Sequence, residues 1–373
     1  MQLCCRDFFY LQKAFDTVDH AILLEKLSHC GIRGPMHDWF KSYLSGRTQF
    51  TAIGKIHSKP ENVNFGVPQG SVLGPILFLI YMNDISNAVR GPKIKLFADD
   101  TNMFMKADNL NLLNTECNYY LAELNVWFLS NRLSLNIEKT GYILFQPKFR
   151  KWRTNSIDLA INGLRINQLT ASKYLGIIID ARLNWKEHID YVYKKLIKFI
   201  GIFYRLRNRM PNPCLKNLYF ALVYPHLLYG VELYMNSFKV YFERLSILNN
   251  KLLRILQREK METPVKSLYA NYNILPINLI FKSQLLLLVF KFMFHKELIP
   301  RAFHVYFVTN RQVHGYYTRS FNNLHLRKFS KCIGQRCFKY QGGKAWNLLP
   351  SNLKIQCSVS QFKKDVYTYL LST

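Results

Sequence analysis

The most constraining feature of this sequence is a pair of adjacent carboxylates, Asp99 and Asp100, held between two apolar segments. Residues 93–104 predict two strands joined by a tight acidic turn at this pair. Unpaired charge near a sheet interior is costly, and like charges repel. A divalent metal resolves the cost, because Mg²⁺ is coordinated by carboxylate oxygens together with phosphate oxygens and water. An isolated Asp-Asp pair is more often an acidic surface turn, so the surrounding sequence decides between the two interpretations.

The first half of the chain predicts a mixed α+β domain around this hairpin. The elements expected from hydrophobic periodicity and turn residues are a strand at 8–11, helices at 17–30, 36–44, 75–85 and 110–134, a hairpin over 49–65, and short strands at 142–146, 156–161 and 174–179. Residues expected on the inner side of the last helix are Leu110, Leu113, Cys117, Leu121, Leu124 and Trp127.

The pattern changes near Trp185. From there the sequence is helical and basic to about residue 258, and then mostly helical to about Ile299. We therefore expect three domains, over residues 1–185, 186–261 and 262–373. Cations alternate with aromatic residues in the second domain, and those expected to bind nucleic acid are Lys194, Lys195, Lys198, Arg205, Arg207 and Arg209.

Net charge indicates the class of partner. The chain has 51 Lys and Arg against 23 Asp and Glu, a formal charge of +28. A surface of that charge repels itself unless a polyanion neutralises it, so nucleic acid is the expected partner. The alternatives are a basic protein without such a partner and a membrane-surface binder. The apolar runs at 76–82 and 285–290 fall short of the ~20 residues that a membrane span needs, so we expect buried helices and no membrane partner.

The eight cysteines are scattered and have no zinc-knuckle spacing. We interpret them as buried thiols in a reducing compartment, with a metal site near Cys332, Cys337 and His325 as the alternative. No basic-then-apolar leader opens the sequence, so a nuclear or cytoplasmic location is expected rather than secretion. Nothing in the sequence indicates the oligomeric state.

The segments around the acidic pair resemble, in order, the sequence blocks of reverse transcriptases from jockey-like non-LTR retrotransposons. Those segments are Lys-Ala-Phe-Asp at 13–16, Gly-Val-Pro-Gln-Gly at 66–70 with the apolar run to residue 85, Phe-Ala-Asp-Asp at 97–100, residues 133–140, the primer-grip-like Lys-Tyr-Leu-Gly at 173–176, and a C-terminal tail at Arg319, 346–350 and 362–363. A lone Ala-Asp-Asp is a weak signal, but ordered blocks over nearly the whole chain are a strong one.

This resemblance implies an RNA-directed DNA polymerase. The implied fold is α+β, a reverse-transcriptase palm with an antiparallel sheet backed by helices, followed by a helical thumb and a mostly helical C-terminal region. The implied partners are an RNA template, a DNA primer and deoxynucleoside triphosphates, and the implied cofactor is Mg²⁺ as two ions. Asp99 would bind the metal, and Asp100 would support the site.

The resemblance also implies roles for four residues outside the acidic pair. Phe15 would lie under the incoming sugar and exclude a ribose 2′-hydroxyl, although a lone Phe beside a strand is more often core packing. Gln69 and Gly70 would pass close to template and nucleotide, the glycine allowing near backbone approach. Lys139 would neutralise or protonate the leaving pyrophosphate, or it is only a solvated lysine. Asp16 is expected to be structural, and Asp84 a local cap or turn residue.

The sequence departs from the family pattern at one metal carboxylate. The first block begins with an Asp three residues before the position of Lys13, and Tyr10 stands there. A phenol with a pKa near 10 is a poor Mg²⁺ ligand, and Asp7 would leave the opposite face of a regular strand. We expect an impaired enzyme, or alternatively a catalytically dead nucleic-acid-binding remnant. The family's fingers segments and endonuclease are not present, which suggests a truncated element or an incomplete gene model.

Overall fold

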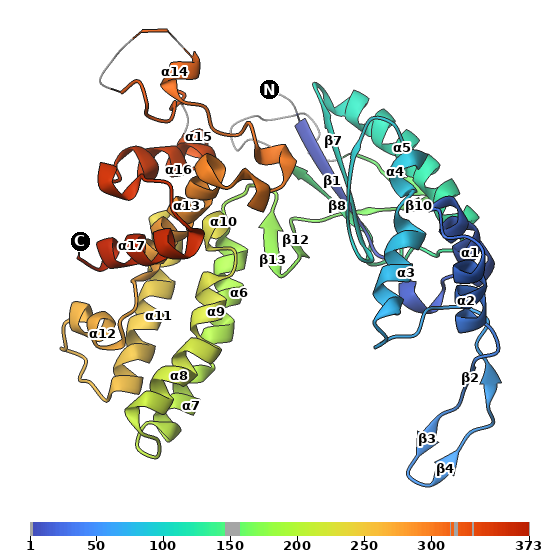
Figure 1. The fold of residues 1–373 in the computed structure, drawn as a ribbon, viewed down its shortest axis with the longest axis horizontal. Helices are drawn as coiled ribbons and strands as arrows, with labels where there is room; N and C mark the ends of the chain where they lie inside the picture. The colour runs from blue at the N-terminus through green and yellow to red at the C-terminus, as the bar shows by residue number, and fades with distance from the viewer. Residues whose placement is uncertain (1–2, 146–156, 314, 317–319, 330–331, 373) are drawn as a thin grey trace. The chain divides into compact units, whose positions relative to one another are not determined.

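The chain folds into two compact units. The computed structural model describes residues 3–145, 157–313, 315–316, 320–329 and 332–372 (Figure 1). Unit 1 comprises Met1–Ser172 with Asp180–Leu183, and unit 2 comprises Lys173–Ile179 with Asn184–Thr373. The expected boundary between residues 261 and 262 falls inside unit 2, and the three-domain division stays a prediction. Gln146, Ser156 and Arg319, which carried sequence predictions, lie outside the described residues.

Unit 1 is organised by a five-stranded sheet with the order β11-β8-β1-β7-β6. The bounds are β1 Leu3–Phe9, β6 Lys93–Phe97, β7 Asp100–Ala107, β8 Gly141–Phe145 and β11 Asn167–Gln168. The central strand β1 is antiparallel to both β7 and β8, whereas β11 is parallel to β8. An antiparallel core sheet within a largely helical chain confirms the α+β class.

Helices of unit 1 follow the predicted pattern with shifted ends. Their bounds are α1 His20–His29, α2 Pro35–Leu44, α3 Leu73–Met82, α4 Ile85–Ala88 and α5 Leu110–Ser130. The helix predicted over 75–85 is two helices, interrupted at Asn83–Asp84. The apolar run at 76–82, expected to form a buried helix, is buried on one side of α3 only, because Ile76 and Leu79 are 49% and 53% exposed.

One face of the sheet packs against α5. Cys5 and Phe9 of β1 join Met103 and Met105 of β7 in one core cluster with the inner side of α5. Phe128 lies in this core, whereas Trp127, predicted to be on the inner side, is only partly buried. Consecutive residues of a helix point about 100° apart. Phe128, rather than Trp127, therefore lies on the face of α5 that packs against the sheet.

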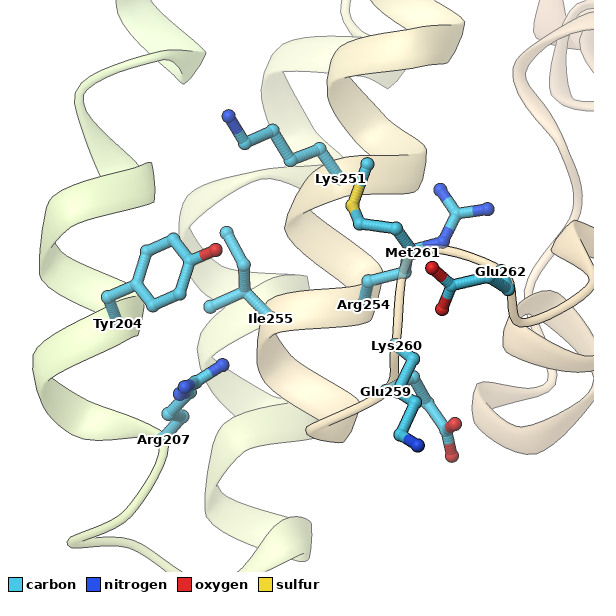
Figure 2. A pocket seen from close by; sticks show the side chains of 9 residues that line it. All are labelled: Tyr204, Arg207, Lys251, Arg254, Ile255, Glu259, Lys260, Met261 and Glu262. Atoms are coloured by element: carbon cyan, nitrogen blue, oxygen red, sulfur yellow. The ribbon is translucent and has the colours of Figure 1, made fainter.

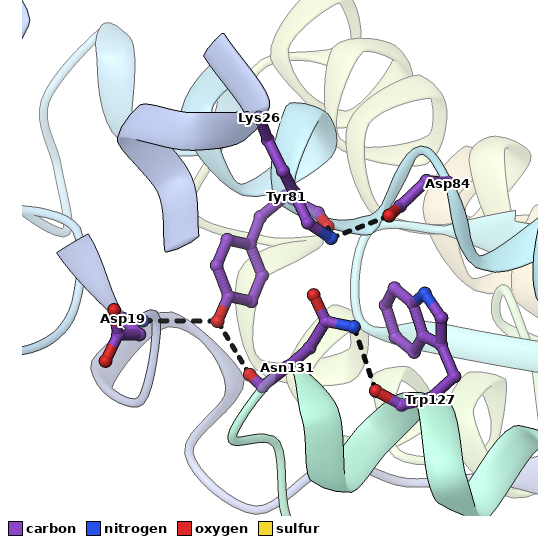
Figure 3. Close-up of polar contacts among 6 residues, drawn as sticks. All are labelled: Asp19, Lys26, Tyr81, Asp84, Trp127 and Asn131. Carbon is purple, nitrogen blue, oxygen red and sulfur yellow. Dashed lines mark hydrogen bonds and ion pairs between the residues drawn. The ribbon is translucent and has the colours of Figure 1, made fainter. Parts of the chain in front are cut away.

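A polar network fastens α1, α3 and α5 together at the rim of this core (Figure 3). The hydroxyl of Tyr81 donates to the carbonyl of Asn131 at 2.6 Å, and the backbone N–H of Asp19 donates to that hydroxyl at 3.4 Å. Lys26 Nζ donates to the Tyr81 carbonyl and to Asp84 Oδ1, both at 2.6 Å. Asp84 lies in the turn between α3 and α4, which confirms the turn residue expected there. Its side chain makes no capping hydrogen bond and instead forms an ion pair with Lys26.

The hairpin expected over 49–65 is confirmed as a long, thin arm of unit 1 (Figure 1). It is built from β2 Thr48–Gln49 paired with β5 Glu61–Asn62, and β3 Ala52–Ile53 paired with β4 Ile56–His57. Another small hairpin, β9 Ala160–Ile161 with β10 Leu164–Arg165, occupies the end of the strand predicted at 156–161.

The single strand predicted at 174–179 is wrong. Residues there form a hairpin of β12 Ala171–Tyr174 and β13 Ile177–Asp180, turning at Leu175 and Gly176. Both turn residues are left-handed, with φ of 47° and 80°, as a two-residue hairpin turn of right-handed twist requires. Leu175 is an unusual residue for that conformation, and its carbonyl accepts a 2.5 Å hydrogen bond from the hydroxyl of Tyr229.

Unit 2 is helical, as the sequence predicts after Trp185. The bounds of its helices are α6 Lys186–Leu196, α7 Phe199–Leu206, α8 Asn212–Leu222, α9 Tyr224–Leu228, α10 Val231–Tyr234, α11 Lys239–Gln257, α12 Val265–Tyr272, α13 Ile277–Phe294, α14 Asn310–Val313, α15 Cys332–Gln335, α16 Phe338–Asn347 and α17 Val359–Ser372. One hydrophobic cluster runs from Ile189 to Leu370 and so includes helices from both predicted C-terminal domains.

Helix α13 is a long apolar helix and packs against α16 and α17. Its Phe290 ring stacks on Phe362 of α17 with centroids 3.9 Å apart. At 18 residues and a mean hydropathy of 1.6 it is longer than the predicted run and apolar enough to cross a membrane. Core helices satisfy the same criterion, and Leu286 and Val289 are fully buried inside unit 2, so the composition of α13 is weak evidence for a membrane span.

Candidate active site

The acidic pair lies at the end of the β6–β7 hairpin. Phe97 pairs with Asp100 across the ladder, which leaves Ala98 and Asp99 as the two turn residues. Ala98 has a φ of 51°, a left-handed conformation that costs a residue with a Cβ about 1–2 kcal/mol. The predicted strand–acidic turn–strand is confirmed, and the turn places two carboxylates at one corner of the sheet.

Strand β1 brings Tyr10 to the same corner. The antiparallel register of β1 and β7 ends with Phe9 opposite Thr101. Tyr10 directly follows Phe9 and Asp100 directly precedes Thr101, so one further step of this register would set Tyr10 opposite Asp100. Directly opposed residues in an antiparallel ladder point to the same face. The position that the sequence identifies as lacking a metal carboxylate therefore lies beside the acidic pair.

A cation occupies the same face of the sheet two rows away. The guanidinium of Arg6 donates from Nε and Nη2 to Asn102 Oδ1, at 3.1 and 2.9 Å. It also lies over the rings of Phe8 and Phe104, 4.4 and 4.9 Å from their centroids. Burial, followed by repulsion from Asp99, raises the pKa of Asp100, and Arg6 opposes that rise.

The loop over residues 134–140 closes against the end of β1. The N–H of Asn136 donates to the carbonyl of Tyr10 at 2.7 Å, and the N–H of Gln12 donates to that of Ser134 at 2.8 Å. Lys139 is exposed on this loop, where its own N–H donates to Asn136 Oδ1. These backbone contacts bring the loop that carries Lys139 to the end of β1. The chemical role of Lys139 stays a prediction.

The Gly-Val-Pro-Gln-Gly segment packs directly on the first block. Val67 donates its N–H to the carbonyl of Phe15 at 2.8 Å. A Cβ at Gly66, where φ is 88°, would come within 2.9 Å of the Asp16 backbone, so this approach needs glycine. Gln69 Nε2 donates to Asp16 Oδ1 at 2.8 Å.

That last hydrogen bond gives Asp16 a positioning contact that the sequence did not reveal. Asp16 and Gln69 are 53 residues apart, and neither sequence block alone indicates the pairing. Phe15 is partly buried and stacks on Phe78 with ring centroids 4.4 Å apart. Gly70 is exposed with a φ of 83°, and among the described residues no atom lies within 4 Å of a Cβ built there.

The carboxylates at this corner fit a divalent cation only in part. Asp99 and Asp100 are adjacent, and the raised pKa of Asp100 is the mark of a charge that a bound cation would stabilise. The position opposite Asp100 belongs to Tyr10, whose phenol is a poor donor to Mg²⁺. The two remaining carboxylates are therefore the donors available for a hard cation.

A second group of possible metal donors lies on the other face of the sheet. Cys5, Asp7 and Cys117 are all buried, and their ligand atoms lie within 4.8 Å of one another. Three donors fall short of the four of a structural zinc site, and hydrogen bonding with Cys117, followed by burial, raises the pKa of the Cys5 thiol. Asp7 points away from the acidic corner, as the strand periodicity predicts. For the alternative metal site near His325, the side chain of Cys332 lies outside the described residues.

The cations predicted to bind nucleic acid all lie in unit 2. Their positions are Lys194 and Lys195 in the last turn of α6, Lys198 just before α7, Arg205 within α7, and Arg207 and Arg209 directly after it. Lys195 lies 4.7 Å and Lys173 5.3 Å from the ring centre of Tyr191. Hydrogen bonding from Lys195, and then from Lys173, lowers the pKa of Tyr191. The sequence did not single out Tyr191.

Comparison with known proteins assigns the class. Residues 5–179 match the family model described as "Reverse transcriptase (RNA-dependent DNA polymerase)". They span β1, the acidic hairpin, the Gly-Val-Pro-Gln-Gly segment and the β12–β13 turn, so this part of the chain is a reverse transcriptase domain. Its family consists of nucleotidyltransferases.

The domain is homologous to those of jockey and other non-LTR retrotransposons. The chain is 28% identical over 258 residues to the RNA-directed DNA polymerase from mobile element jockey of Drosophila melanogaster, covering 66% of this chain and 28% of that protein. It is 29% identical over 265 residues to the probable RNA-directed DNA polymerase from transposon BS of the same organism, covering 68% and 29%. The chain thus spans less than a third of the length of these relatives.

A solved structure of telomerase from Candida albicans, in complex with a fragment of telomeric RNA, is a more distant match. It is 14% identical, with a TM-score of 0.31, and the match covers 72% of this chain and 40% of that chain. At that score the likeness carries no argument beyond the family match.

Proposed function

We propose that this chain carries the polymerase centre of an RNA-directed DNA polymerase, which extends a DNA primer on an RNA template. Unit 1 would be the palm, and the helices of unit 2 would include the thumb. The observation that carries the proposal is the convergence of four sequence blocks at the end of β1. The acidic hairpin, the first block, the 134–140 loop and the Gln69 segment all contact one corner of unit 1.

Asp99 and Asp100 would hold the divalent cations, which we propose are two Mg²⁺ ions. When bound, they would supply charge stabilisation for the attacking and leaving oxygens of an in-line displacement. The carboxylates would provide hard oxygen donors, and the left-handed Ala98 would hold them at the exposed end of the hairpin. Burial raises the pKa of Asp100 and so disfavours its charged form. A bound cation would stabilise that charged form.

The surrounding side chains would position the nucleotide and template. Phe15 is braced from below by Phe78, so its ring would form a rigid floor that excludes a ribose 2′-hydroxyl. Asp16 would hold the amide of Gln69 through their 2.8 Å hydrogen bond, and the open left-handed backbone at Gly70 would allow close approach of a base. Lys139 would donate positive charge, or a proton, to the leaving pyrophosphate.

We further propose that catalysis in this sequence is impaired at Tyr10. Tyr10 follows the last ladder pair of β1, Phe9 with Thr101, so its phenol would lie opposite Asp100, where a third carboxylate would complete the cation's coordination. Loss of a metal-held charge is worth several kcal/mol, and each ~1.4 kcal/mol is tenfold in rate. The expected loss is several orders of magnitude.

A second candidate function is nucleic-acid binding without chemistry. It is favoured by the same Tyr10 position together with the cations of unit 2, of which Lys194, Lys198, Arg205 and Arg209 are exposed. Both candidates predict salt-sensitive binding of RNA or DNA. Only the polymerase requires Asp99.

Primer extension separates the two candidates. The chain and its Tyr10→Asp variant are incubated with an RNA template, a DNA primer and deoxynucleoside triphosphates, with and without Mg²⁺. The polymerase proposal expects Mg²⁺-dependent extension, at least in the variant, that Asp99→Ala abolishes while RNA binding is kept. Extension that is unchanged by Asp99→Ala contradicts the metal site, and no extension in either protein leaves the binding function in its place.

A further inference from the structure

We propose that a pocket in unit 2 binds one nucleotide of a single-stranded nucleic acid, separately from the polymerase corner of unit 1. The pocket lies between the end of α7, the C-terminal half of α11 and the loop that follows α11 (Figure 2). Its volume is about 370 Å³, within the range of small-molecule sites. Its lining residues are Tyr204, Arg207, Lys251, Arg254, Ile255, Glu259, Lys260, Met261 and Glu262.

Charge in the lining favours a single phosphate. Four cations face two carboxylates, Glu259 and Glu262. In Figure 2, Arg207 and Lys251 extend from α7 and α11 into the space between these helices, from opposite sides of Tyr204. Four cations against two carboxylates leave a net charge of +2, which attracts the single negative charge of a phosphodiester. A nucleoside triphosphate carries several, and the two glutamates would repel it.

Two exposed apolar groups provide surfaces for a base. Tyr204 is 47% exposed and Met261 is 66% exposed, although both line a pocket. Ile255 behind them is buried and forms an apolar wall. Bases stack on aromatic side chains regardless of sequence, because every base has a π-face. An aromatic ring, a thioether and the cations of Arg207 and Lys251 in one pocket are groups that can hold a nucleotide.

Three arginine side chains hold the elements that line the pocket in place. The Arg207 guanidinium lies 4.7 Å from the ring centre of Tyr204 and braces it. Arg258 donates to the carbonyls of Arg207 and Met210, both at 2.8 Å, which ties the end of α7 to the end of α11. Arg254 donates to the carbonyl of Thr263 at 3.1 Å and so fixes the loop that carries Met261.

A single strand fits this pocket better than a duplex. The bases of a duplex are stacked inside it and present phosphates alone, whereas an unpaired base can be splayed out onto an aromatic ring. A phosphate-only ligand would leave Tyr204 and Met261 without a role. The inference therefore names both a phosphate and a base, and the two can be tested separately.

Binding of a fluorescein-labelled oligouridine 12-mer to the full chain tests the pocket, measured by fluorescence anisotropy in EDTA without triphosphates. Stacking of one base is worth about 1–3 kcal/mol, so Tyr204→Ala should weaken binding roughly fivefold or more, and Tyr204→Phe should not. Lys251→Ala should lower the slope of log affinity against log salt by about 0.7. Neither result depends on Mg²⁺ or Asp99, so the polymerase proposal can fail without affecting it.

Matched controls decide the outcome. Tyr119→Ala removes another exposed tyrosine, on α5, and should bind as the unaltered chain does. A loss equal to that of Tyr204→Ala would overturn the proposal. So would an equal effect of Tyr204→Ala on duplex RNA, or unchanged binding by an oligomer with abasic sites. Uridine monophosphate and inorganic phosphate should compete only weakly with the oligomer. If either one binds as tightly as the oligomer does, the pocket is a site for a free ligand and the proposal is wrong.

Discussion

The two faces of β1 differ from the expected pattern in opposite ways. On the face that carries Asp100 and Asn102, Tyr10 follows the end of β1, where we propose that the polymerase site lacks a carboxylate. On the face that packs against α5, Asp7 places a carboxyl in an apolar core. It is 1% exposed, and within the described part of the chain its Oδ2 has no hydrogen-bond partner.

The contrast teaches that the effect of a carboxyl group at β1 depends on the face of the sheet that it occupies, and not on how close it is in sequence to the acidic site. Asp7 and Tyr10 are three residues apart and therefore point to opposite sides of a strand of period two. A carboxylate at position 10 would serve a cation, whereas the one hydrogen-bond donor to the carboxyl of Asp7 among the described residues is the thiol of Cys5, at 3.5 Å. Under the proposed function, the first face would have lost activity, whereas the buried carboxyl of Asp7 costs stability on the second.

The largest expected effect is on the acidic face. Tyr10→Asp should raise Mg²⁺-dependent primer extension by several orders of magnitude, because a third carboxylate would join Asp99 and Asp100. The rate is measured with a radiolabelled primer on an RNA template. Tyr10→Asn is the matched control, since it removes the ring without adding charge and should not raise the rate. If both variants gain equally, relief of steric hindrance explains the gain and the missing-carboxylate interpretation fails.

The next effect is on the core face. Burial raises the pKa of Asp7 from 3.8 to about 7, although a hydrogen bond from Cys5 opposes the rise. Below pH 3.8 the carboxyl is neutral in both folded and unfolded states and has no ionisation penalty. As the pH rises, the unfolded state ionises first, so stability falls until about pH 7. The penalty above that pH is about 4 kcal/mol.

Asp7→Val should remove this pH dependence. The free energy of unfolding, measured by urea at pH 5 and pH 8, should increase in the variant far more at pH 8 than at pH 5. Asp7→Asn is the control, because it keeps the polar shape and removes only the charge, so it should flatten the pH profile with a smaller gain. A profile that keeps its slope in both variants would show that another group is responsible.

A third prediction tests whether the two faces are independent. Arg6→Met should destabilise unit 1 by about 1–3 kcal/mol, because Asn102 is 1% exposed and its Oδ1 would lose both donors. Removing this cation should also raise the pKa of Asp100 further. In the Tyr10→Asp background, the acid limb of the pH–rate profile should move to higher pH.

The control for that prediction is Arg6→Lys, which keeps the charge but not the two-nitrogen contact. It should lose stability and leave the pH profile nearly in place. If the pH–rate profile is the same with Arg6→Met as with Arg6 in the Tyr10→Asp background, Arg6 does not influence the pKa of Asp100.

The smallest expected effect lies beside the acidic face. Gln69→Ala or Asp16→Asn should lower the efficiency of primer extension in the Tyr10→Asp background about fivefold, because one hydrogen bond is worth roughly 1 kcal/mol. The double variant should lose no more than either single one, since both break the same contact. Losses that multiply would mean that the two residues act separately.

Local periodicity in the sequence predicted most of the elements and the acidic hairpin. The helical character of the chain after Trp185 and the core-facing orientation of Asp7 also followed from it. These features depend on neighbours within one or two turns or strand repeats, which a sequence shows directly. The resemblance to a family supplied the order of the blocks around the site.

The remainder depended on contacts between distant segments. The hydrogen bond from Gln69 to Asp16 joins two loops, and no local pattern reports it. The turn at Leu175 was missed because leucine is not a turn residue, and Tyr229, 54 residues later, stabilises it. Phe128 and Trp127 are adjacent aromatic residues on one helix, and only the packing of α5 on the sheet decides which of them is buried.

The central position of β1 also determines which backbone amides are the slowest to exchange with solvent hydrogen. Residues 4–8 are paired with β7 on one side and β8 on the other, so β1 has no free edge over this length. Exchange there requires the sheet to separate rather than to fray at an edge. Ionisation of Asp7, in the middle of this stretch, would therefore shorten the lifetime of the whole sheet, and exchange rates in β1 would report that opening directly.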